Sequence, residues 1–242
     1  ILMPKRDSLS KLVVFIPQSH ADTVLAALHE AGAGQIGNYK NCSFSVEGTG
    51  TFQPNELANP HIGEAGKQEK VAEIRAEVIF PSHAERNLLN ALKQSHPYEE
   101  IAYYISSLHN ENQEVGAGMI GELPEALEPI AFLAHLKQSM ALQVIRHTPL
   151  IDRKVKKIAL CGGSGSFLLE HAIQAGADFY VSADFKYHEF FDAEKRLTIA
   201  DIGHYESEVY TKDLIGELLT KKFPTFAVNF SATITNPISY YL

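Results

Sequence analysis

The stretch that decides the fold is KKIALC-GGSG (residues 156–165), which is followed by FYVSAD (179–184) and LTIADI (197–202). Each contains a short, mostly apolar run typical of a buried strand, and a helical pattern follows each one, over 166–175, 189–194 and 206–221. Strands that alternate with helices form right-handed βαβ units. The sequence therefore predicts a largely parallel sheet, with a further helix over 130–142 and a last strand over 226–229.

The residues upstream follow a different order. Strand patterns cover 11–16, 42–46, 71–80 and 101–105, and helical patterns begin after Ser19 and at Pro81-Ser82. The glycine-containing residues 47–66 are predicted to form turns. The order βαββαβ is that of a ferredoxin-like sandwich, in which two helices cover one face of an antiparallel sheet. We therefore predict an α/β protein with a ferredoxin-like module over 11–108 and an α/β lobe over 109–242.

The composition limits the class of protein. The 242 residues are 45% hydrophobic and 21% charged, as in a globular protein of one large or two modest domains. The formal net charge of −8 disfavours binding to nucleic acid. No apolar run approaches the ~20 residues that span a bilayer, and two cysteines, Cys42 and Cys161, are too few for a disulfide framework. We expect a cytoplasmic protein without a membrane partner, in which Cys161 is a buried strand residue.

Unusual residues follow the three strand patterns of the downstream half. Ligands bind outside the carboxyl ends of the strands in an open parallel sheet, so these residues are candidates for function. The first group is Gly162, Gly163, Ser164 and Gly165, which leads into a helix whose free N–H groups would attract an anion. It lacks the full GxGxxG pattern, and a plain tight turn explains the same residues.

The second strand pattern ends at Asp184, and Lys186 and His188 follow it. An acid, an amine and an imidazole within five positions could bind phosphate or move protons, so these three are the candidate catalytic residues. The alternative is a polar loop in which Asp184 caps a helix.

The third strand pattern leads to His204 and Glu208. If a helix begins near His204, the two side chains stand at i and i+4 and share one face. Imidazole and carboxylate at this spacing suit a divalent transition metal. Two ligands do not complete a site, and the alternative is a solvated helix start whose acidic residues are favoured by the helix dipole.

Taken together, GGSG (162–165), SADFKYH (182–188) and DIGHYESE (201–208) resemble the C-terminal lobe of the GTP cyclohydrolase 1 type 2 family, also called Nif-three-like. Upstream, GAG (32–34), GTGTF (48–52) and HPYEE (96–100) are similar to the PII/CutA-like domain that longer members carry between two lobes. The resemblance makes residues 11–108 a PII/CutA-like insert and residues 1–10 a linker from a missing N-terminal lobe. It implies a homohexamer with a two-metal site between the lobes.

His204 and Glu208 match the G-H-x-x-x-E pattern of that lobe, whereas the His-His pair and Asp of the N-terminal lobe have no match here. The resemblance implies two divalent metal ions per complete site, with zinc, iron and manganese not distinguished. It also implies a hydrolase acting on a nucleotide such as GTP or on another phosphorylated substrate, which Gly162–Gly165 would contact. The alternative is a non-enzymatic regulator or scaffold whose insert binds a small molecule or a metal.

Overall fold

The computed structural model describes residues 1–241, and the chain divides into two compact units. One unit is Pro4–Val115, and the other combines Ile1–Met3 with the chain from Gly116 onward. Residues 1–10, predicted to be a linker, hold strand β1 (Met3–Lys5) and the start of β2, and β1 pairs with β6 (Asn112–Ala117) in a separate two-stranded sheet. Within residues 1–241, no helix is long and apolar enough to cross a membrane.

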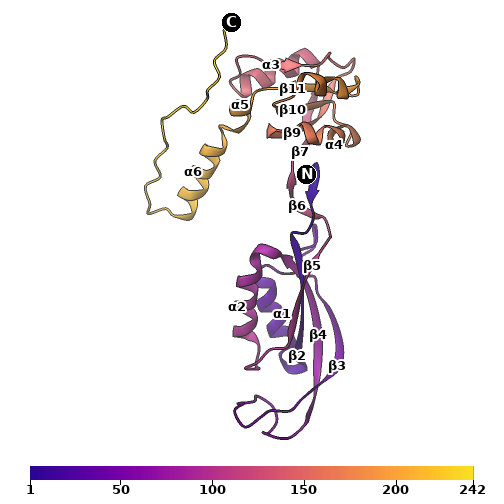
Figure 1. Cartoon of the computed structure of the whole chain (residues 1–242), viewed down its shortest axis with the longest axis vertical. Helices are drawn as coiled ribbons and strands as arrows, with labels where there is room; N and C mark the ends of the chain where they lie inside the picture. Colours follow the sequence, from indigo (N-terminus) through magenta and orange to yellow (C-terminus); the bar gives the residue numbers. More distant parts are fainter. Residues whose placement is uncertain (242) are drawn as a thin grey trace. The chain divides into compact units, whose positions relative to one another are not determined.

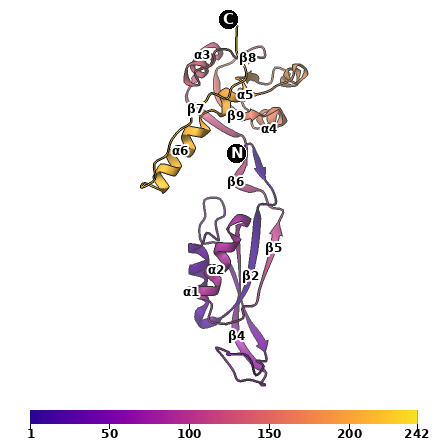
Figure 2. The same cartoon turned by 60° about the vertical axis from the view of Figure 1, so that its left-hand side comes forward.

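The unit Pro4–Val115 is an antiparallel sheet with two helices. Its strands have the order β3-β4-β2-β5. Figures 1 and 2 both show α1 and α2 side by side on one face of this sheet. Along the chain the elements are β2 (Leu9–Pro17), α1 (Ala21–Glu30), β3 (Phe44–Phe52), β4 (Glu69–Pro81), α2 (Glu85–Ser95) and β5 (Tyr103–Leu108), with short 3-10 turns at Gln18–His20 and Ser82–Ala84.

Alternation along β2 separates the two faces of this sheet. Leu12, Val14 and Ile16 are fully buried and belong to the core that the helices cover. The helices contribute Val24 and Leu28 from α1 and Leu88 and Leu92 from α2. Each such side chain stabilises the fold by about 1.5–3 kcal/mol through the area it removes from water. The residues in between, such as Phe15, point to the opposite face of the sheet.

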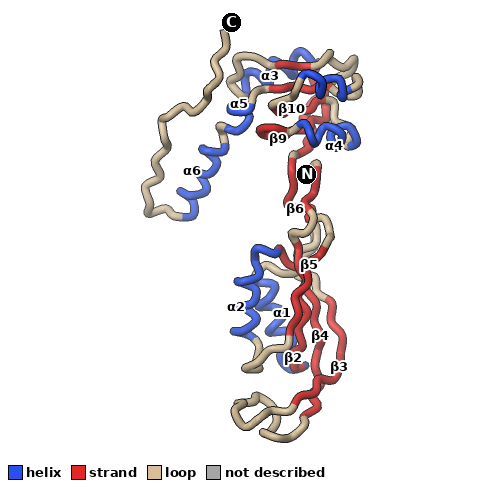
Figure 3. Tube along the Cα trace, viewed as in Figure 1, coloured by secondary structure: helices blue, strands red, loops and turns tan. Residues whose placement is uncertain are grey.

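The prediction of turns over 47–66 is wrong for its first part, because β3 continues to Phe52. The connection between β3 and β4, drawn as a tan loop in Figure 3, covers only residues 53–68. Gly48 pairs with Glu73 and Gly50 with Val71 in a regular antiparallel register. A Cβ atom on Gly50 would lie 2.1 Å from Oε2 of Glu73. The glycine therefore leaves room for a neighbouring carboxylate instead of forming a turn.

The second unit is built on a mixed five-stranded sheet with the order β7-β9-β10-β11-β8. The three central strands are parallel, as predicted, whereas the edge strands β7 and β8 are antiparallel to their neighbours. Antiparallel edge strands on a parallel sheet are common. The elements are β7 (Met119–Leu127), α3 (Pro129–Ser139), β8 (Arg146–His147), β9 (Val155–Ser164), α4 (Leu169–Gln174), β10 (Phe179–Ala183), β11 (Thr198–Asp201), α5 (His204–Glu208) and α6 (Thr211–Lys222), with 3-10 turns at Ser166–Leu168 and Tyr187–Ala193.

Both faces of the central strands are covered, so every residue of β10 is buried. Tyr180 packs in one core, with α4, and Phe179 and Val181 pack in the other, with Phe132 of α3. A strand buried on both faces needs a continuous apolar run, which is why FYVSA carries no alternation of polar residues.

Two predicted elements of this unit differ from the structure. The helix expected over 206–221 is two helices, α5 and α6, separated at Val209 and Tyr210. Within α5 the Ser207 hydroxyl donates to the carbonyl of His204 at 2.8 Å and competes with helical hydrogen bonds. Residues 226–229 form no strand, because β8 already occupies that edge of the sheet and the segment pairs with no strand in the described chain.

Candidate functional site

The carboxyl ends of β9, β10 and β11 bring the three sequence motifs to one edge of the sheet. The predicted glycine loop is the bulged end of a strand, because β9 extends through Ser164. Leu160 still pairs with Val181, and after the bulge Ser164 pairs with Ala183. Bulges of this kind are common next to functional sites because they redirect the chain. Here the bulge places Gly163 beside α5, where its N–H donates to the Ser207 hydroxyl at 2.8 Å.

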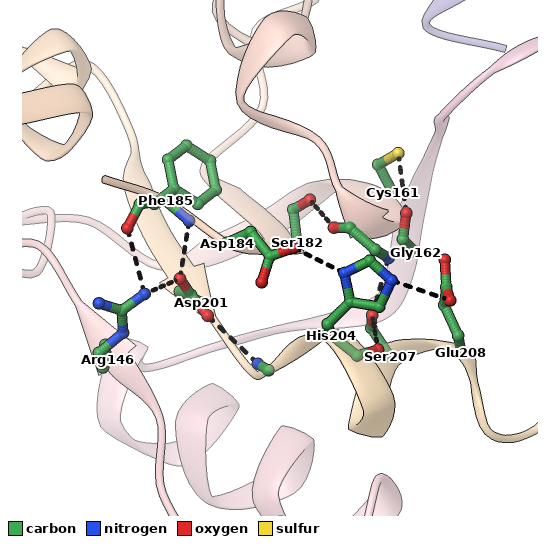
Figure 4. Close-up of polar contacts among 12 residues, drawn as sticks. Arg146, Cys161, Gly162, Ser182, Asp184, Phe185, Asp201, His204, Ser207 and Glu208 are labelled. Atoms are coloured by element: carbon green, nitrogen blue, oxygen red, sulfur yellow. Dashed lines mark hydrogen bonds and ion pairs between the residues drawn. The ribbon is translucent and has the colours of Figure 1, made fainter. Parts of the chain in front are cut away.

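His204 lies between two carboxylates at this edge, as Figure 4 shows. Its Nδ1 is 2.6 Å from Oδ2 of Asp184, and its Nε2 is 3.2 Å from Oε2 of Glu208. The hydrogen bond with Asp184 raises the pKa of His204, and the negative charges of both carboxylates act in the same direction. All three side chains are about half exposed, so the group is open to ions and small molecules.

Gly163 is required by the position of Glu208. A Cβ atom at residue 163 would lie 2.4 Å from Oε1 of Glu208 and 3.3 Å from Cε1 of His204. Its φ of +63° is also a conformation that favours glycine. Close packing against the His204–Glu208 pair therefore explains the glycine at 163, whereas a Cβ atom at Gly165 would lie 2.2 Å from Oγ of Ser182.

Asp201 connects the loop of Asp184 to the start of α5. Its buried carboxylate accepts hydrogen bonds from the N–H of Phe185 at 3.0 Å and from the N–H of Gly203 at 3.2 Å. It also forms an ion pair with Arg146 of β8. Sequence reasoning did not single out Asp201 or Arg146. The position of Asp201 in the motif DIGHYESE, at the end of a predicted strand, could have identified it. Nothing in the sequence links it to Arg146, which is 55 positions away.

Two carbonyl groups of the glycine segment accept hydrogen bonds from side chains of β10. The Ser182 hydroxyl donates to the carbonyl of Gly163 at 3.1 Å, and the Tyr180 hydroxyl donates to that of Gly165 at 2.6 Å. Contact between Gly162–Gly165 and a substrate stays a prediction.

The structure brings one of the three candidate catalytic residues to His204. Asp184 contacts it directly, whereas Lys186 and His188 are exposed and, in the part of the chain that the structure describes, make no hydrogen bond with His204 or Glu208. The N–H of Lys186 instead donates to Glu189 at 2.8 Å. Cys161, predicted to be buried, is only partly buried. This partial burial raises the pKa of the Cys161 thiol.

The donor set fits part of a metal site. Two protein ligands on one tetrahedral zinc ion are about 3.4 Å apart, since each bond is ~2.1 Å long. The separation of 3.2 Å between Nε2 of His204 and Oε2 of Glu208 is close to this value. Among residues 1–241, however, no group of three or more His, Cys, Asp or Glu side chains is arranged to hold a metal ion.

Comparison with known proteins identifies relatives over nearly the whole chain. The GTP cyclohydrolase 1 type 2 homologs of Bacillus subtilis (strain 168) and Halalkalibacterium halodurans are each 38% identical over 238 residues, which are 97% of this chain and 64% of theirs. A solved Bacillus cereus protein related to NIF3 has a TM-score of 0.79 and 38% identity, over 100% of this chain and 65% of that one. This chain thus spans just under two thirds of the length of these relatives.

The family resemblance predicted from the three strand-end motifs is confirmed by these comparisons. The family model described as Duf34/NIF3 (NGG1p interacting factor 3) matches residues 17–237. That match covers both units, including the strand ends with Asp184, His204 and Glu208. The chain therefore belongs to the Duf34/NIF3 family.

Proposed function

We propose that His204 and Glu208 bind a divalent metal ion and that Asp184 orients His204 for this role. The observation that supports the proposal is the placement of one imidazole between two carboxylates, with Nδ1 2.6 Å from Asp184 and Nε2 3.2 Å from Glu208. A histidine that binds a metal through one ring nitrogen almost always donates the other N–H to a carboxylate, a carbonyl or water. Asp184 fits the role of the carboxylate that accepts this N–H, and Nε2 of His204 would then be the metal ligand.

The site needs further ligands, because structural and catalytic zinc sites take three or four protein donors and two-metal sites take more. We infer that these ligands lie outside the 242 residues and that the complete site holds two ions. Two ions held there would supply Lewis acidity, which would lower the pKa of bound water and polarise a phosphoryl oxygen. In this chain Asp184 would keep the proton on Nδ1 of His204, and Gly163 would leave space for the Glu208 carboxylate.

We further propose that the complete protein is a metal-dependent hydrolase of a nucleotide or another phosphorylated substrate. The anionic part of such a substrate would lie near Gly162–Gly165, Lys186 and His188 at the same edge of the sheet. Pro4–Val115 would be a ferredoxin-like, PII/CutA-like insert, a proposal supported by its βαββαβ order and its sheet order. A cytoplasmic homohexamer is the proposed assembly.

Zinc titration tests the metal proposal directly on the 242-residue chain. We expect weak binding that His204→Ala and Glu208→Gln abolish and that Asp184→Asn weakens about 10–100-fold, as expected for loss of a supporting hydrogen bond. His135→Ala removes an exposed histidine of α3 in the same unit and is the matched control. Zinc affinity that is the same in His204→Ala, Glu208→Gln and His135→Ala would contradict the proposal.

The hydrolase proposal has a separate test at the full length of the relatives. Metal-loaded protein is incubated with GTP, and product formation is compared with that of the Glu208→Gln variant. Turnover that is lost in the variant supports the proposal. Metal binding without any turnover of GTP or other nucleotides would leave the metal site intact and overturn the proposed reaction.

A further inference from the structure

The unit Pro4–Val115 contains a cavity of about 660 Å³ on the helix-free face of its sheet. Its floor is formed by residues that pair across three strands: Phe15 of β2 with Arg75 of β4 and Val46 of β3, and Glu73 with Gly48. The rim comes from the loop after β3, which Figure 3 draws in tan, and from the segment that precedes β5. The volume lies within the range of about 300–1,000 Å³ that is usual for small-molecule sites.

Two aromatic pairs line this cavity. Phe15 and Tyr104 meet edge to face with ring centroids 5.7 Å apart, and Phe52 and Tyr98 do so at 5.8 Å. The negative face of an aromatic ring attracts a cation, and the ring body packs well against a flat apolar group. These walls therefore favour a ligand that combines positive charge with apolar surface.

A buried carboxylate lies on the floor between these walls. Glu73 is only 9% exposed, and Oε1 accepts a hydrogen bond of 3.1 Å from the Tyr98 hydroxyl. Burial and this contact raise the pKa of Tyr98, so its hydroxyl keeps its proton. Within residues 1–241 no Lys, Arg or His side chain lies within ion-pair distance of Glu73. A buried charge without a positive partner is costly, and a bound cation would offset that cost.

The surroundings of Glu73 reinforce this preference. Glu99 and Glu100 also line the cavity, and its basic lining residues are His61 and Arg75. The guanidinium of Arg75 is already paired with Glu77 at 2.7 Å. The absence of a side chain at Gly50 makes the room that the Glu73 carboxylate occupies, because a Cβ atom there would lie 2.1 Å from Oε2. Acidic residues therefore outnumber basic ones in the lining, and one of them, Glu73, is a buried acceptor.

We propose that this cavity binds a small organic cation, with a protonated amine at Glu73 and a flat apolar body between the two aromatic pairs. An inorganic divalent ion fits less well, because it needs several converging oxygen donors and gains nothing from a large aromatic cavity. A second copy of this face would bring Glu73 against Glu73 in a twofold contact and is disfavoured by charge. The proposal is independent of the metal site and does not require it.

Calorimetric titration of the 242-residue protein with tryptamine and phenethylamine tests the proposal. Indole-3-acetate has the ring of tryptamine with the opposite charge. We expect the amines to bind and indole-3-acetate not to bind in the same concentration range. Glu73→Gln keeps the size of the side chain and its contact with Tyr98 but removes the charge, so it should weaken amine binding about 10–100-fold. Glu85→Gln, an exposed position on α2, is the matched control and should bind like the wild type.

A second variant guards against loss of structure in Glu73→Gln. Gly50→Ala has an allowed backbone conformation but places a methyl group against the Glu73 carboxylate, so it should also weaken amine binding. Circular dichroism establishes that both variants are folded. Equal binding of tryptamine and indole-3-acetate, unchanged affinity in both variants, or no binding of either amine would overturn the proposal. Displacement of tryptamine by lower concentrations of Mg²⁺, or self-association that abolishes amine binding, would overturn it as well.

Discussion

Replacing Gly163 with alanine tests the idea that this residue is glycine because Glu208 must be accommodated. The new methyl group would lie 2.4 Å from Oε1 of Glu208, which is far inside van der Waals contact. The carboxylate would have to turn away from Nε2 of His204, now 3.2 Å from Oε2. The substitution therefore separates the two proposed ligands without changing either of them.

Two effects of different size are expected from Gly163→Ala. The φ of +63° costs an alanine about 1–2 kcal/mol of stability. Displacement of Glu208 adds a loss of metal affinity of about 10–100-fold, comparable to the loss of a group that orients a ligand. Gly176→Ala separates the two effects, because Gly176 has φ of +72° with nothing within 4 Å of its Cβ position. Both variants should lose similar stability, and only Gly163→Ala should lose zinc affinity.

The assay combines urea unfolding, followed by circular dichroism, with zinc titration of the folded chain. The reasoning is refuted if Gly163→Ala binds zinc as tightly as Gly176→Ala does. It is also refuted if Gly176→Ala alone reduces zinc affinity, since that residue does not contact the site.

Three further perturbations have expected outcomes. Asp201→Asn should lower the free energy of unfolding in urea by about 1–3 kcal/mol, because the buried carboxylate loses its ion pair with Arg146. The exposed Asp213→Asn should lower it by almost nothing, and equal losses in the two variants would contradict this role of Asp201. Burial lowers the pKa of His96, so as the pH falls the unfolded chain binds a proton at this residue before the folded chain does. The free energy of unfolding should therefore fall as the pH drops below about 6.5. Unfolding measured at several pH values should show a smaller fall in the His96→Gln variant. Burial of Asp178 opposes its ionisation, but hydrogen bonds from two backbone N–H groups and from Arg153 lower its pKa. Asp178→Ala should therefore reduce the free energy of unfolding by about 3 kcal/mol near neutral pH. A reduction that does not become smaller below about pH 4 would refute this role of the ionised carboxylate.

The parts of the fold that the sequence predicts are those determined by local patterns. The parallel order of β9, β10 and β11 follows from apolar runs separated by helical segments, and all three strands are present. The antiparallel edges were missed because the direction of an edge strand depends on the whole path of the chain. Residues 48–52 are predicted to form turns because glycine is common in turns. The actual reason for Gly50 is its contact with Glu73 of β4, which a local sequence pattern does not reveal.

The candidate site shows the same limit. The i, i+4 spacing of His204 and Glu208 is a local feature, and the structure places their side chains within 3.2 Å. The contact of His204 with Asp184 depends on the left-handed conformations of Asp184 and Gly203, with φ of +58° and +93°. No pattern in the sequence reveals these angles or the ion pair of Asp201 with a residue of β8. The metal, substrate and catalytic roles stay predictions.

The pairing of β1 with β6 has a consequence for how this chain can change in length. The segment Pro4–Val115 leaves and re-enters the rest of the chain on adjacent hydrogen-bonded strands, and the N–H of Leu2 donates to the carbonyl of Gly118 at 3.1 Å just outside it. Its core is made entirely of its own residues, such as Leu12 and Leu88. Two cuts and one tight hairpin turn would therefore excise more than a hundred residues without opening the core around Tyr180. The path of the chain therefore allows Pro4–Val115 to be removed or replaced as one segment.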